Sequence, residues 1–304
     1  QEGFPTVSGK PKNIKQHNQR LILSILQNGG VYAVGDLSRQ ISMSKTTALK
    51  IINNFCESGI VCSAGKGNST NEGGKKPELF MLNPEYRYSL VVSLAIPYEL
   101  VCAAVNFSGQ IVHMHTASLS PDLDYSETVK VIALAISRAM DQMPIKSKRL
   151  CGISIACDEI IDTLTGSIIC SKHHSWGRNL PIKQDLSEQL NFKTPIYVDN
   201  ICRFAGYAEL LSNDLPQYDD LITIWCDNQA GGCILSNRQL IDGFNGIVGD
   251  FGHIMVDPSS DVVCPGCGRR GCLESLISRP AVLQYASNIA EEYLPAQPRQ
   301  RAVL

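Results

Sequence analysis

The sequence predicts an α/β protein with a separate, mostly helical domain at its N-terminus. Apolar residues recur at helical spacing near the N-terminus, whereas strand-like and helical segments alternate after residue 86. Charge is divided in the same way. Residues 1–86 contain ten Lys and Arg against six Asp and Glu, and the remainder contains seventeen against twenty-three. A basic domain joined to an acidic one is typical of a DNA-binding module attached to a ligand-binding module.

The composition narrows the class of protein. With 304 residues, 44% of them hydrophobic, the chain can bury a substantial core and is expected to form two or three domains. No apolar run is long enough to span a bilayer, and no signal-peptide pattern opens the chain. Its twelve cysteines are too sparse for a small disulfide scaffold and are typical of a reducing compartment. We therefore expect a cytoplasmic protein without a membrane partner.

The N-terminal segment has the helix order of a helix-turn-helix. Gly29 follows the first helical pattern and ends it, and Ser44 follows a tight turn as the N-cap of the third helix. Leu49 is expected on the inner face of that third helix. These signals predict helices over residues 13–28, 34–40 and 44–56.

The exposed face of the third helix is expected to contact DNA. Its side chains can bind phosphates and base edges, and the first of them lie at the helix N-terminus, which normally meets the major groove. A solvated helix face without DNA contacts is the alternative. The predicted DNA-binding residues on this helix are Lys45, Thr46, Thr47, Lys50 and Asn54.

A β-hairpin wing is predicted after the third helix. Two strand-like runs, at residues 59–61 and 78–83, flank a stretch rich in Gly, Lys and Asn. Lys75 and Lys76 are expected to reach phosphates or the minor groove. The winged helix-turn-helix is therefore expected to cover residues 1–86.

Strand and helix patterns alternate through the rest of the chain, which indicates an α/β body. A further set of strands is expected to begin a second lobe. The predicted strands lie at residues 89–95, 100–106, 110–115, 150–156, 196–198 and 221–225, and the predicted helix at 126–140.

One group of cysteines has the spacing of metal ligands. Cys264, Cys267 and Cys272 follow His253 closely, and the intervening glycines allow the backbone to turn tightly. Three thiols and one imidazole can complete a tetrahedron around zinc, which leaves no open position for a reactive water. The pattern therefore predicts a structural Zn²⁺ ion. Three ordinary buried thiols beside an unrelated histidine are the alternative.

These features together resemble the ROK family of repressors, open reading frames and sugar kinases, specifically its transcriptional regulators. The most specific part of the resemblance is the Gly-His pair followed by Cys-Gly-x-x-Gly-Cys-Leu-Glu, which ends at Glu274. It implies an actin-like, ribonuclease-H-like sugar-kinase fold over residues 87–304. The first lobe is expected at about 87–200 and the second at about 201–304. Because the chain stops at Leu304, soon after the motif, the second lobe is expected to be incomplete.

The resemblance also implies that His253, Cys264, Cys267 and Cys272 bind zinc. Family members usually have Cys-x-Cys where this chain has one more residue between Cys264 and Cys267. Either Cys264 still ligates the metal through a slightly enlarged loop, or water or another group replaces it. We favour the first interpretation.

An effector site is implied by the same resemblance. The family's sugar-binding residues correspond here to Asn200, Asp250, His253 and Glu274. Asp250 replaces a glutamate, and its shorter side chain is expected to change which sugar is accepted. Local capping and loop hydrogen bonds are the alternative role for Asn200, Asp250 and Glu274. The effector is therefore expected to be an unusual sugar, a sugar derivative or nothing at all.

Three departures from the family's kinases predict that no catalytic residue remains. Ile201 stands where those enzymes have their catalytic Asp, and isoleucine cannot accept a proton. Residues 93–97 and 227–232 stand where the two phosphate-binding loops are expected, and they lack the glycine pattern of such loops.

The sequence thus predicts a repressor of carbohydrate-metabolism genes. Its expected partners are a double-stranded DNA operator and a carbohydrate-like effector, and it is expected to form a homodimer or a larger homo-oligomer. An ATP-dependent sugar kinase with an appended DNA-binding domain is the alternative, and a DNA-binding scaffold without a ligand is a third possibility.

Overall fold

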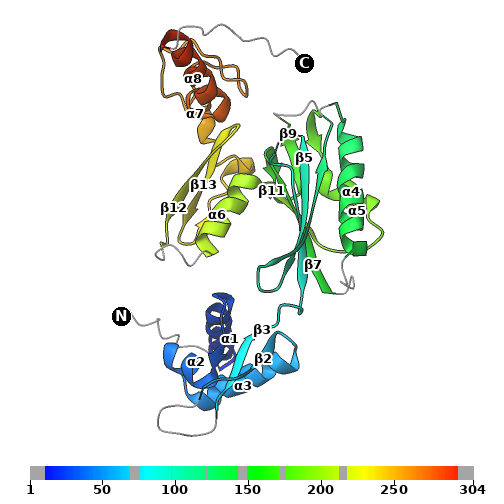
Figure 1. The fold of residues 1–304 in the computed structure, drawn as a ribbon, viewed down its shortest axis with the longest axis vertical. Helices are drawn as coiled ribbons and strands as arrows, with labels where there is room; N and C mark the ends of the chain where they lie inside the picture. The colour runs from blue at the N-terminus through cyan, green and yellow to red at the C-terminus, as the bar shows by residue number, and fades with distance from the viewer. Residues whose placement is uncertain are drawn as a thin grey trace, which may run out of the picture. The chain divides into compact units, whose positions relative to one another are not determined.

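The computed structural model describes residues 11–68, 76–96, 98–120, 122–142, 149–171, 176–211 and 218–293. Figure 1 labels most of its helices and strands in chain order. The helices are α1 (Pro11–Gln27), α2 (Val34–Gln40), α3 (Lys45–Glu57), α4 (Tyr125–Gln142), α5 (Ile182–Gln189), α6 (Ile201–Leu211), α7 (Glu274–Ile277) and α8 (Arg279–Tyr293), with short 3-10 helices η2 (Phe244–Gly246) and η3 (Phe251–His253).

The strands group into four sheets. They are β1 (Tyr32–Ala33), β2 (Val61–Lys66), β3 (Glu78–Leu82), β4 (Tyr88–Ser93), β5 (Glu99–Asn106), β6 (Ile111–Ser118), β7 (Leu150–Cys157), β8 (Ile160–Asp162), β9 (Ser167–Cys170), β10 (Arg178–Leu180), β11 (Ile196–Asn200), β12 (Leu221–Cys226), β13 (Ala230–Ser236) and β14 (Gln239–Leu240).

The first three helices and strands form the predicted winged helix-turn-helix. The sheet has the order β1-β3-β2, and both pairings are antiparallel. The backbone N–H of Thr47 donates to the Ser44 hydroxyl at 3.2 Å, which confirms Ser44 as the N-cap of α3. Ile22, Leu37 and Ile52 lie fully buried in the core that the helices and the hairpin share.

The prediction that Leu49 faces this core is wrong. Its side chain is 43% exposed. The buried stripe of α3 consists of Ala48, Ile51, Ile52 and Phe55, which follow helical spacing from residue 48. Leu49 lies about 100° around the helix from Ala48 and therefore falls at the edge of that stripe.

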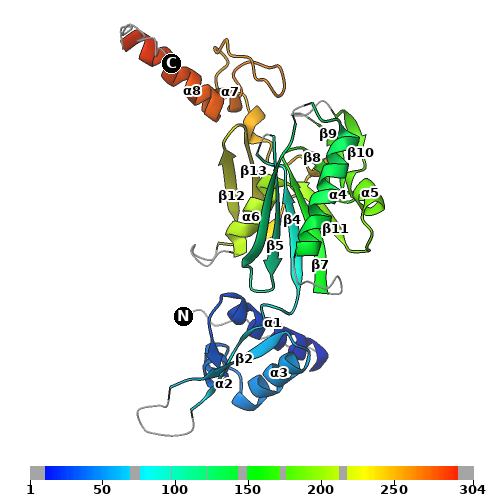
Figure 2. The same cartoon turned by 45° about the vertical axis from the view of Figure 1, so that its right-hand side comes forward.

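A five-stranded sheet with the order β11-β7-β4-β5-β6 forms the centre of the body. Its strands, together with α4 and β12, occupy the segments in which the sequence predicts them. β7 is buried along almost its whole length, as expected for a strand covered on both faces. Figure 2 shows α4 and α5 beside one another against the sheet. None of the described helices combines the length and the apolar content that crossing a bilayer requires.

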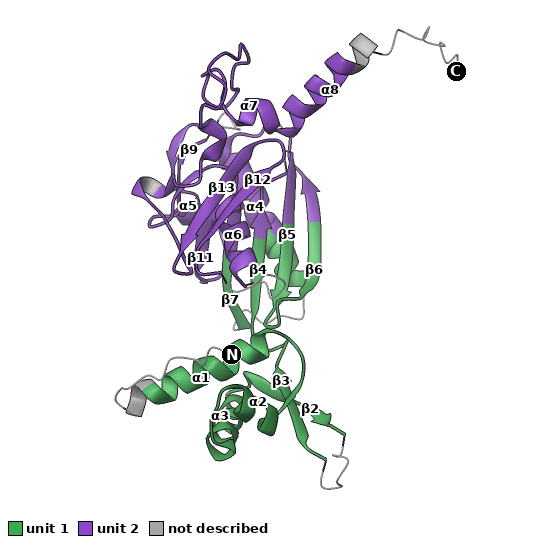
Figure 3. Cartoon of the chain, turned by 90° about the vertical axis from the view of Figure 1, so that its left-hand side faces the viewer, with its two compact units in different colours: residues 1–91, 102–115, 136–153 green, residues 92–101, 116–135, 154–304 purple. Residues whose placement is uncertain are grey.

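The chain divides into two compact units, which Figure 3 colours separately. Unit 1 consists of residues 1–91, 102–115 and 136–153, and unit 2 of residues 92–101, 116–135 and 154–304. Unit 1 therefore contains the winged helix and part of the large sheet. Unit 2 contains the residues of the expected zinc and sugar sites. The domain boundary at residue 86 stays a prediction.

The second set of strands forms an antiparallel sheet with the order β12-β13-β14. Helix α6 packs against β12 and β13. The close contact between α6 and β13 depends on Gly206 of α6, because a Cβ atom at that position would lie 2.0 Å from the Cys233 sulfur of β13. The face of the hairpin that carries Cys233 is therefore the face that meets α6.

Candidate functional site

Most of the predicted DNA-contacting side chains of α3 are accessible. Thr47 is half-buried, and its hydroxyl lies 2.8 Å from that of Ser44, so it takes part in the helix cap. In the wing, Lys76 is exposed and Lys75 lies outside the described residues. The contacts of these side chains with DNA stay predictions. The exposed members on α3 are Lys45, Thr46, Lys50 and Asn54.

The four predicted metal ligands come together in space. Their ligand atoms all lie within 4.8 Å of one another. His253 ends η3, and Cys272 directly precedes the Leu-Glu pair at the start of α7. Two isolated bridges, Met255 with Cys272 and Val263 with Arg270, hold the loop that supplies the other two thiols. This loop includes Cys264, so the longer spacing does not remove that thiol from the group.

The donor spacing is compatible with tetrahedral zinc. The sulfurs of Cys267 and Cys272 are 3.5 Å apart, and the Cys264 sulfur lies 3.5 Å from Nδ1 of His253. Zinc–sulfur bonds of about 2.3 Å and zinc–nitrogen bonds of about 2.0 Å place such donors roughly 3.5–3.8 Å apart. Burial acts to raise the pKa of Cys267, but hydrogen bonds from the Arg269 backbone and side chain and from the neighbouring thiols lower it to about 7. A lowered pKa favours the thiolate, which is the form that binds metal.

His253 connects this cluster to the adjoining pocket. Its Nδ1 atom faces Cys264, whereas its Nε2 atom lies 3.9 Å from a carboxylate oxygen of Asp250. The backbone of Gly266 lies close to the imidazole ring, since a Cβ atom at this position would lie 2.9 Å from the Cε1 atom of His253. Arg269 donates to the backbone oxygen of His253 at 3.0 Å. One imidazole can therefore serve the metal with one nitrogen and a ligand in the pocket with the other.

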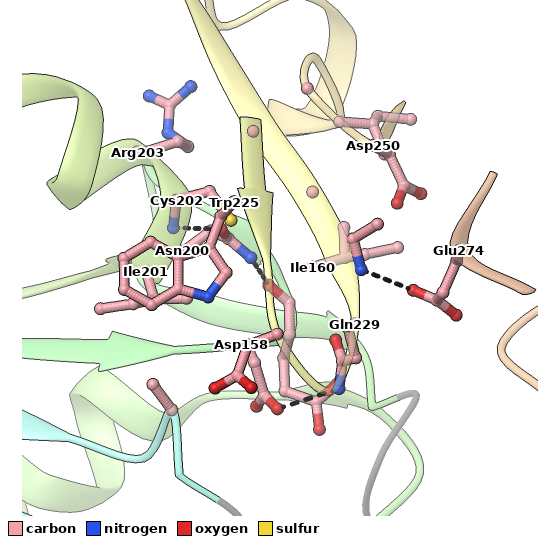
Figure 4. A pocket seen from close by; sticks show the side chains of 18 of the residues that line it. Asp158, Ile160, Asn200, Ile201, Cys202, Arg203, Trp225, Gln229, Asp250 and Glu274 are labelled. Carbon is pink, nitrogen blue, oxygen red and sulfur yellow. Dashed lines mark hydrogen bonds between the residues drawn. The ribbon is translucent and has the colours of Figure 1, made fainter. Parts of the chain in front are cut away.

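The pocket lies entirely within unit 2, and Figure 4 shows part of its lining. Its walls come from the segment after β7, the β11–α6 junction, the β12–β13 hairpin and the segment around η2 and η3. The carboxyl end of β11 and the start of α6 thus meet loops from distant parts of the chain. All four residues expected to bind the effector line this pocket: Asn200, Asp250, His253 and Glu274.

Two of these residues also make hydrogen bonds within the protein, but only the bond between Cys202 and Asn200 is local, as the alternative interpretation expects. The amide oxygen of Asn200 accepts from the Cys202 backbone at 2.8 Å, and its amide nitrogen donates to the Glu159 carbonyl at 3.1 Å. Glu274 is buried and accepts from the Ala230 backbone at 3.2 Å. Such bonds fix both side chains in the pocket wall. The remaining lone pairs and amide hydrogens of Asn200, and the remaining lone pairs of Glu274, can still hydrogen-bond to a ligand.

Positions at which the sequence predicts a departure from the family's kinases also line the pocket. Ile201 is the first residue of α6, and Ile96 follows β4; Pro97 lies outside the described residues. Asp227 forms an ion pair with Arg279, and its carbonyl accepts from the Arg279 backbone at 2.6 Å. The β12–β13 turn is thus bound to the start of α8 by contacts within the chain.

Sequence reasoning missed two acidic residues directly after β7. Glu159 is buried and accepts from Ser171 at 2.7 Å. Asp158 accepts from Gln229 at 3.3 Å through one oxygen, and its other oxygen is buried without a hydrogen-bond partner among the described residues. Burial and the Glu159 charge raise the pKa of Asp158 to about 7. Their position at the end of a buried strand was the available signal.

Arg203 was also missed. It is buried in the first turn of α6 and pairs with Asp199 at 2.8 Å and with Asp242. Burial acts to lower the pKa of Arg203, and the two carboxylates raise it above its usual value. The i, i+4 spacing from Asp199 to Arg203 was a weak signal, whereas Asp242 is distant in sequence. The charge of Arg203 is therefore already compensated within the protein.

Two family models match this chain. Residues 98–302 match the model described as ROK family, and residues 15–61 match the model described as winged helix-turn-helix DNA-binding. The xylose repressor of Bacillus subtilis strain 168 is 25% identical over 274 residues, which cover 89% of this chain and 68% of that protein.

Solved structures share the fold. A crystal structure of a ROK family transcriptional regulator, a homologue of the E. coli MLC protein, matches with a TM-score of 0.69 and 20% identity and covers 93% of this chain and 69% of that one. A ROK family glucokinase from Streptomyces griseus, in complex with glucose and AMPPNP, matches with a TM-score of 0.57 and 24% identity and covers 68% of this chain and 62% of that one.

Proposed function

Because this chain belongs to the ROK family and carries a winged helix-turn-helix, we propose that it is a sugar-responsive repressor of carbohydrate-metabolism genes. The observation that carries the proposal is the presence, in one chain, of a winged helix and of the pocket lined by Asn200, Asp250, His253 and Glu274. The winged helix would bind the operator, and the pocket would bind the effector. The xylose repressor, which is similar over most of this chain, supports the same assignment.

In this proposal the winged helix of residues 1–86 binds double-stranded DNA. Lys45, Thr46 and Lys50 at the start of α3 would enter the major groove, and Lys75 and Lys76 of the wing would bind phosphates. The basic balance of this segment supports the assignment, because phosphate neutralisation supplies much of the affinity for DNA. A homodimer would place two such helices on symmetric half-sites, and the protein would act in the cytoplasm.

Zinc has a structural role in this proposal. His253, Cys264, Cys267 and Cys272 would hold it, and four protein ligands leave no position for a reactive water. The cluster would fix the His253 ring so that Nε2 stays directed to the pocket near Asp250. Metal and effector are thereby linked through one side chain. The metal would contribute stability rather than chemistry.

We also propose that the protein is not an enzyme. Ile201 offers no proton acceptor at the position where the kinases have their base. The carboxylate of Asp227 lies in the turn that would have to hold phosphates, and it is already paired with Arg279. A negative charge in that turn opposes phosphate binding. Both observations favour a repressor over a kinase with an added DNA-binding domain.

Contacts inside unit 1 support a route between the body and the winged helix. The tip residue Phe107, directly after β5, packs against the core of the winged helix and stacks edge-on with Tyr86, with ring centroids 5.0 Å apart. Its backbone N–H donates to the Pro84 carbonyl at 3.1 Å, and Arg149 donates to the Glu85 carbonyl at 3.0 Å. A displacement of this end of β5 would therefore reach the winged helix.

Selection of DNA from a random-sequence library by the full chain tests the repressor proposal. We expect enrichment of a sequence with two symmetric halves and binding at least about 10³-fold tighter than to unrelated DNA. A matched protein with Lys45→Ala and Lys50→Ala should enrich nothing. If the unmodified chain recovers nothing but random sequences, that result would contradict the proposal.

A further inference from the structure

The proposed effector pocket has two chemically different ends. Asp250 and Glu274 supply polar groups at one end. Trp225 and Ile201 lie on the opposite side of the pocket in Figure 4. Ile96, which also lines the pocket, is 50% exposed. This side of the pocket thus offers the apolar surfaces of Trp225 and Ile201 beside Asn200, and it lies apart from Asp250 and Glu274, so the pocket has room for a second ring besides a sugar.

Trp225 faces the pocket because of its position in the β12–β13 ladder. It pairs with Gly231, and paired residues project from the same face of an antiparallel sheet. A Cβ atom at Gly231 would lie 3.1 Å from the Cys202 sulfur of α6, so this face is the one that meets α6 and the pocket. Gly231 has no side chain to cover the indole. Trp225 accordingly remains 46% exposed.

The charges that line the pocket as a whole disfavour a ligand that carries phosphate. Asp158, Glu159 and Asp227 all line it. The cation that lines the same pocket, Arg203, is already paired with two carboxylates, and Arg279 is paired with Asp227. A phosphorylated sugar or a nucleotide would bring further negative charge to this excess of carboxylates. An uncharged ligand avoids that repulsion.

We propose that the pocket binds an uncharged glycoside that has two rings. Its sugar ring would lie at the end formed by Asp250, His253 and Glu274, and its second ring would pack on the indole of Trp225. Aromatic side chains bind the apolar face of a ring through buried area and favourable stacking. The second ring is either another sugar or an aromatic aglycone. This inference rests on the proposed function, which places a carbohydrate in the same pocket.

Matched ligands test the role of the second ring. Xylose and glucose are each offered to the full chain as the methyl β-glycoside, as the 4-nitrophenyl β-glycoside and as the β-1,4-linked disaccharide. Affinities are measured by titration calorimetry. For at least one of the two sugars we expect a ligand with a second ring to bind about tenfold tighter than the methyl glycoside. The nitrophenyl and disaccharide arms distinguish an aromatic aglycone from a second sugar.

Substitution of the indole should remove this preference selectively. Trp225→Ala is expected to reduce the tenfold difference to about twofold or less and to leave the affinity for the methyl glycoside nearly unchanged, whereas Trp225→Phe should retain most of the preference. Ile224→Ala is the matched control, because Ile224 is the neighbouring residue of β12, is 60% exposed and projects from the other face of the strand. The chain has two tryptophans, so a Trp176→Phe variant also reports Trp225 fluorescence alone.

The outcomes separate this inference from the proposed function. Equal affinity for methyl and two-ring glycosides, or a preference that survives Trp225→Ala, would overturn the two-ring ligand and leave the sugar-responsive repressor intact. If neither sugar binds in any form, both proposals fail. Retained binding of the methyl glycoside by Trp225→Ala shows that this variant is folded.

Discussion

The Nδ1 atom of His253 lies 3.5 Å from the sulfur of Cys264, while the opposite nitrogen of the same ring points towards Asp250. One side chain is therefore shared by the group of candidate metal ligands and the pocket. This arrangement implies that loss of the metal disturbs the pocket as well as the stability of the fold.

Removal of zinc should lower the melting temperature. Cys272→Ser deletes a buried ligand, and we expect the melting temperature to fall by at least about 5 °C, because the metal binds only the folded chain. Metal analysis should find one zinc per chain. Cys151→Ser is the control, since Cys151 is an exposed thiol outside the cluster. Protein purified without chelator that contains no zinc, or whose melting is insensitive to chelation, would contradict the structural zinc.

The wing lysines should bind DNA phosphates. Replacement of Lys75 and Lys76 by Ala is expected to weaken binding to all sequences and to reduce the slope of log K against log salt by about 2, because each contact releases roughly one counterion. Thr46→Ala should change sequence preference instead. Lys193→Ala, an exposed lysine of the body, is the control. Unchanged affinity of the double variant would remove the wing from the DNA interface.

The protein should not phosphorylate sugars. We expect no sugar-dependent ADP release from ATP with xylose, glucose or amino sugars, and no tight binding of Mg-ATP. Ile201→Asp restores a proton acceptor but not a phosphate site, so it should not restore turnover, although a general base contributes roughly 10²–10⁴ in rate to an intact enzyme. Turnover above background by the unmodified chain would show that it is a kinase.

Asp158 should make stability fall as pH rises. Burial and the neighbouring Glu159 charge raise its pKa in the folded protein to about 7 from an ordinary value of 3.8, so folding favours its protonated form. The free-energy cost of burying the ionised Asp158 side chain is therefore absent below about pH 4, grows as the pH rises and reaches its full value above about pH 7. Asp158→Asn should raise the free energy of unfolding at pH 8 by one to a few kcal/mol, on the order set by 1.36 kcal/mol per pKa unit, and by little at pH 4. Urea melts at both pH values measure this, and an equal effect at both would contradict it.

Residues that are close in sequence made part of this structure predictable. Ser44 stands three residues before Thr47, and this local spacing identified the cap of α3. The proximity of the four candidate metal ligands was predictable because three of them lie within nine residues and glycines separate them. Leu49 was wrongly predicted to be buried, because an apolar residue about 100° around the helix from the buried stripe still matches the apolar pattern of the sequence.

The pocket depends on contacts that sequence spacing does not reveal. Trp225 faces the pocket because Gly231, its partner across the ladder, has no side chain to cover the indole. The pKa of Asp158 is raised to about 7 because folding buries it beside the Glu159 charge. Arg203 is compensated by Asp242, which lies 39 residues further along the chain. Register and long-range burial set these properties, and neither follows from local pattern.

The most direct test of the proposed repressor function is whether a sugar in the pocket releases DNA. Fluorescence anisotropy measures the affinity of the full chain for its selected operator with and without a saturating xyloside or glucoside. We expect at least a tenfold loss of affinity, absence of that loss in Asp250→Ala, and tight but sugar-insensitive DNA binding in Phe107→Ala. An operator affinity that no bound sugar changes would contradict a sugar-responsive repressor.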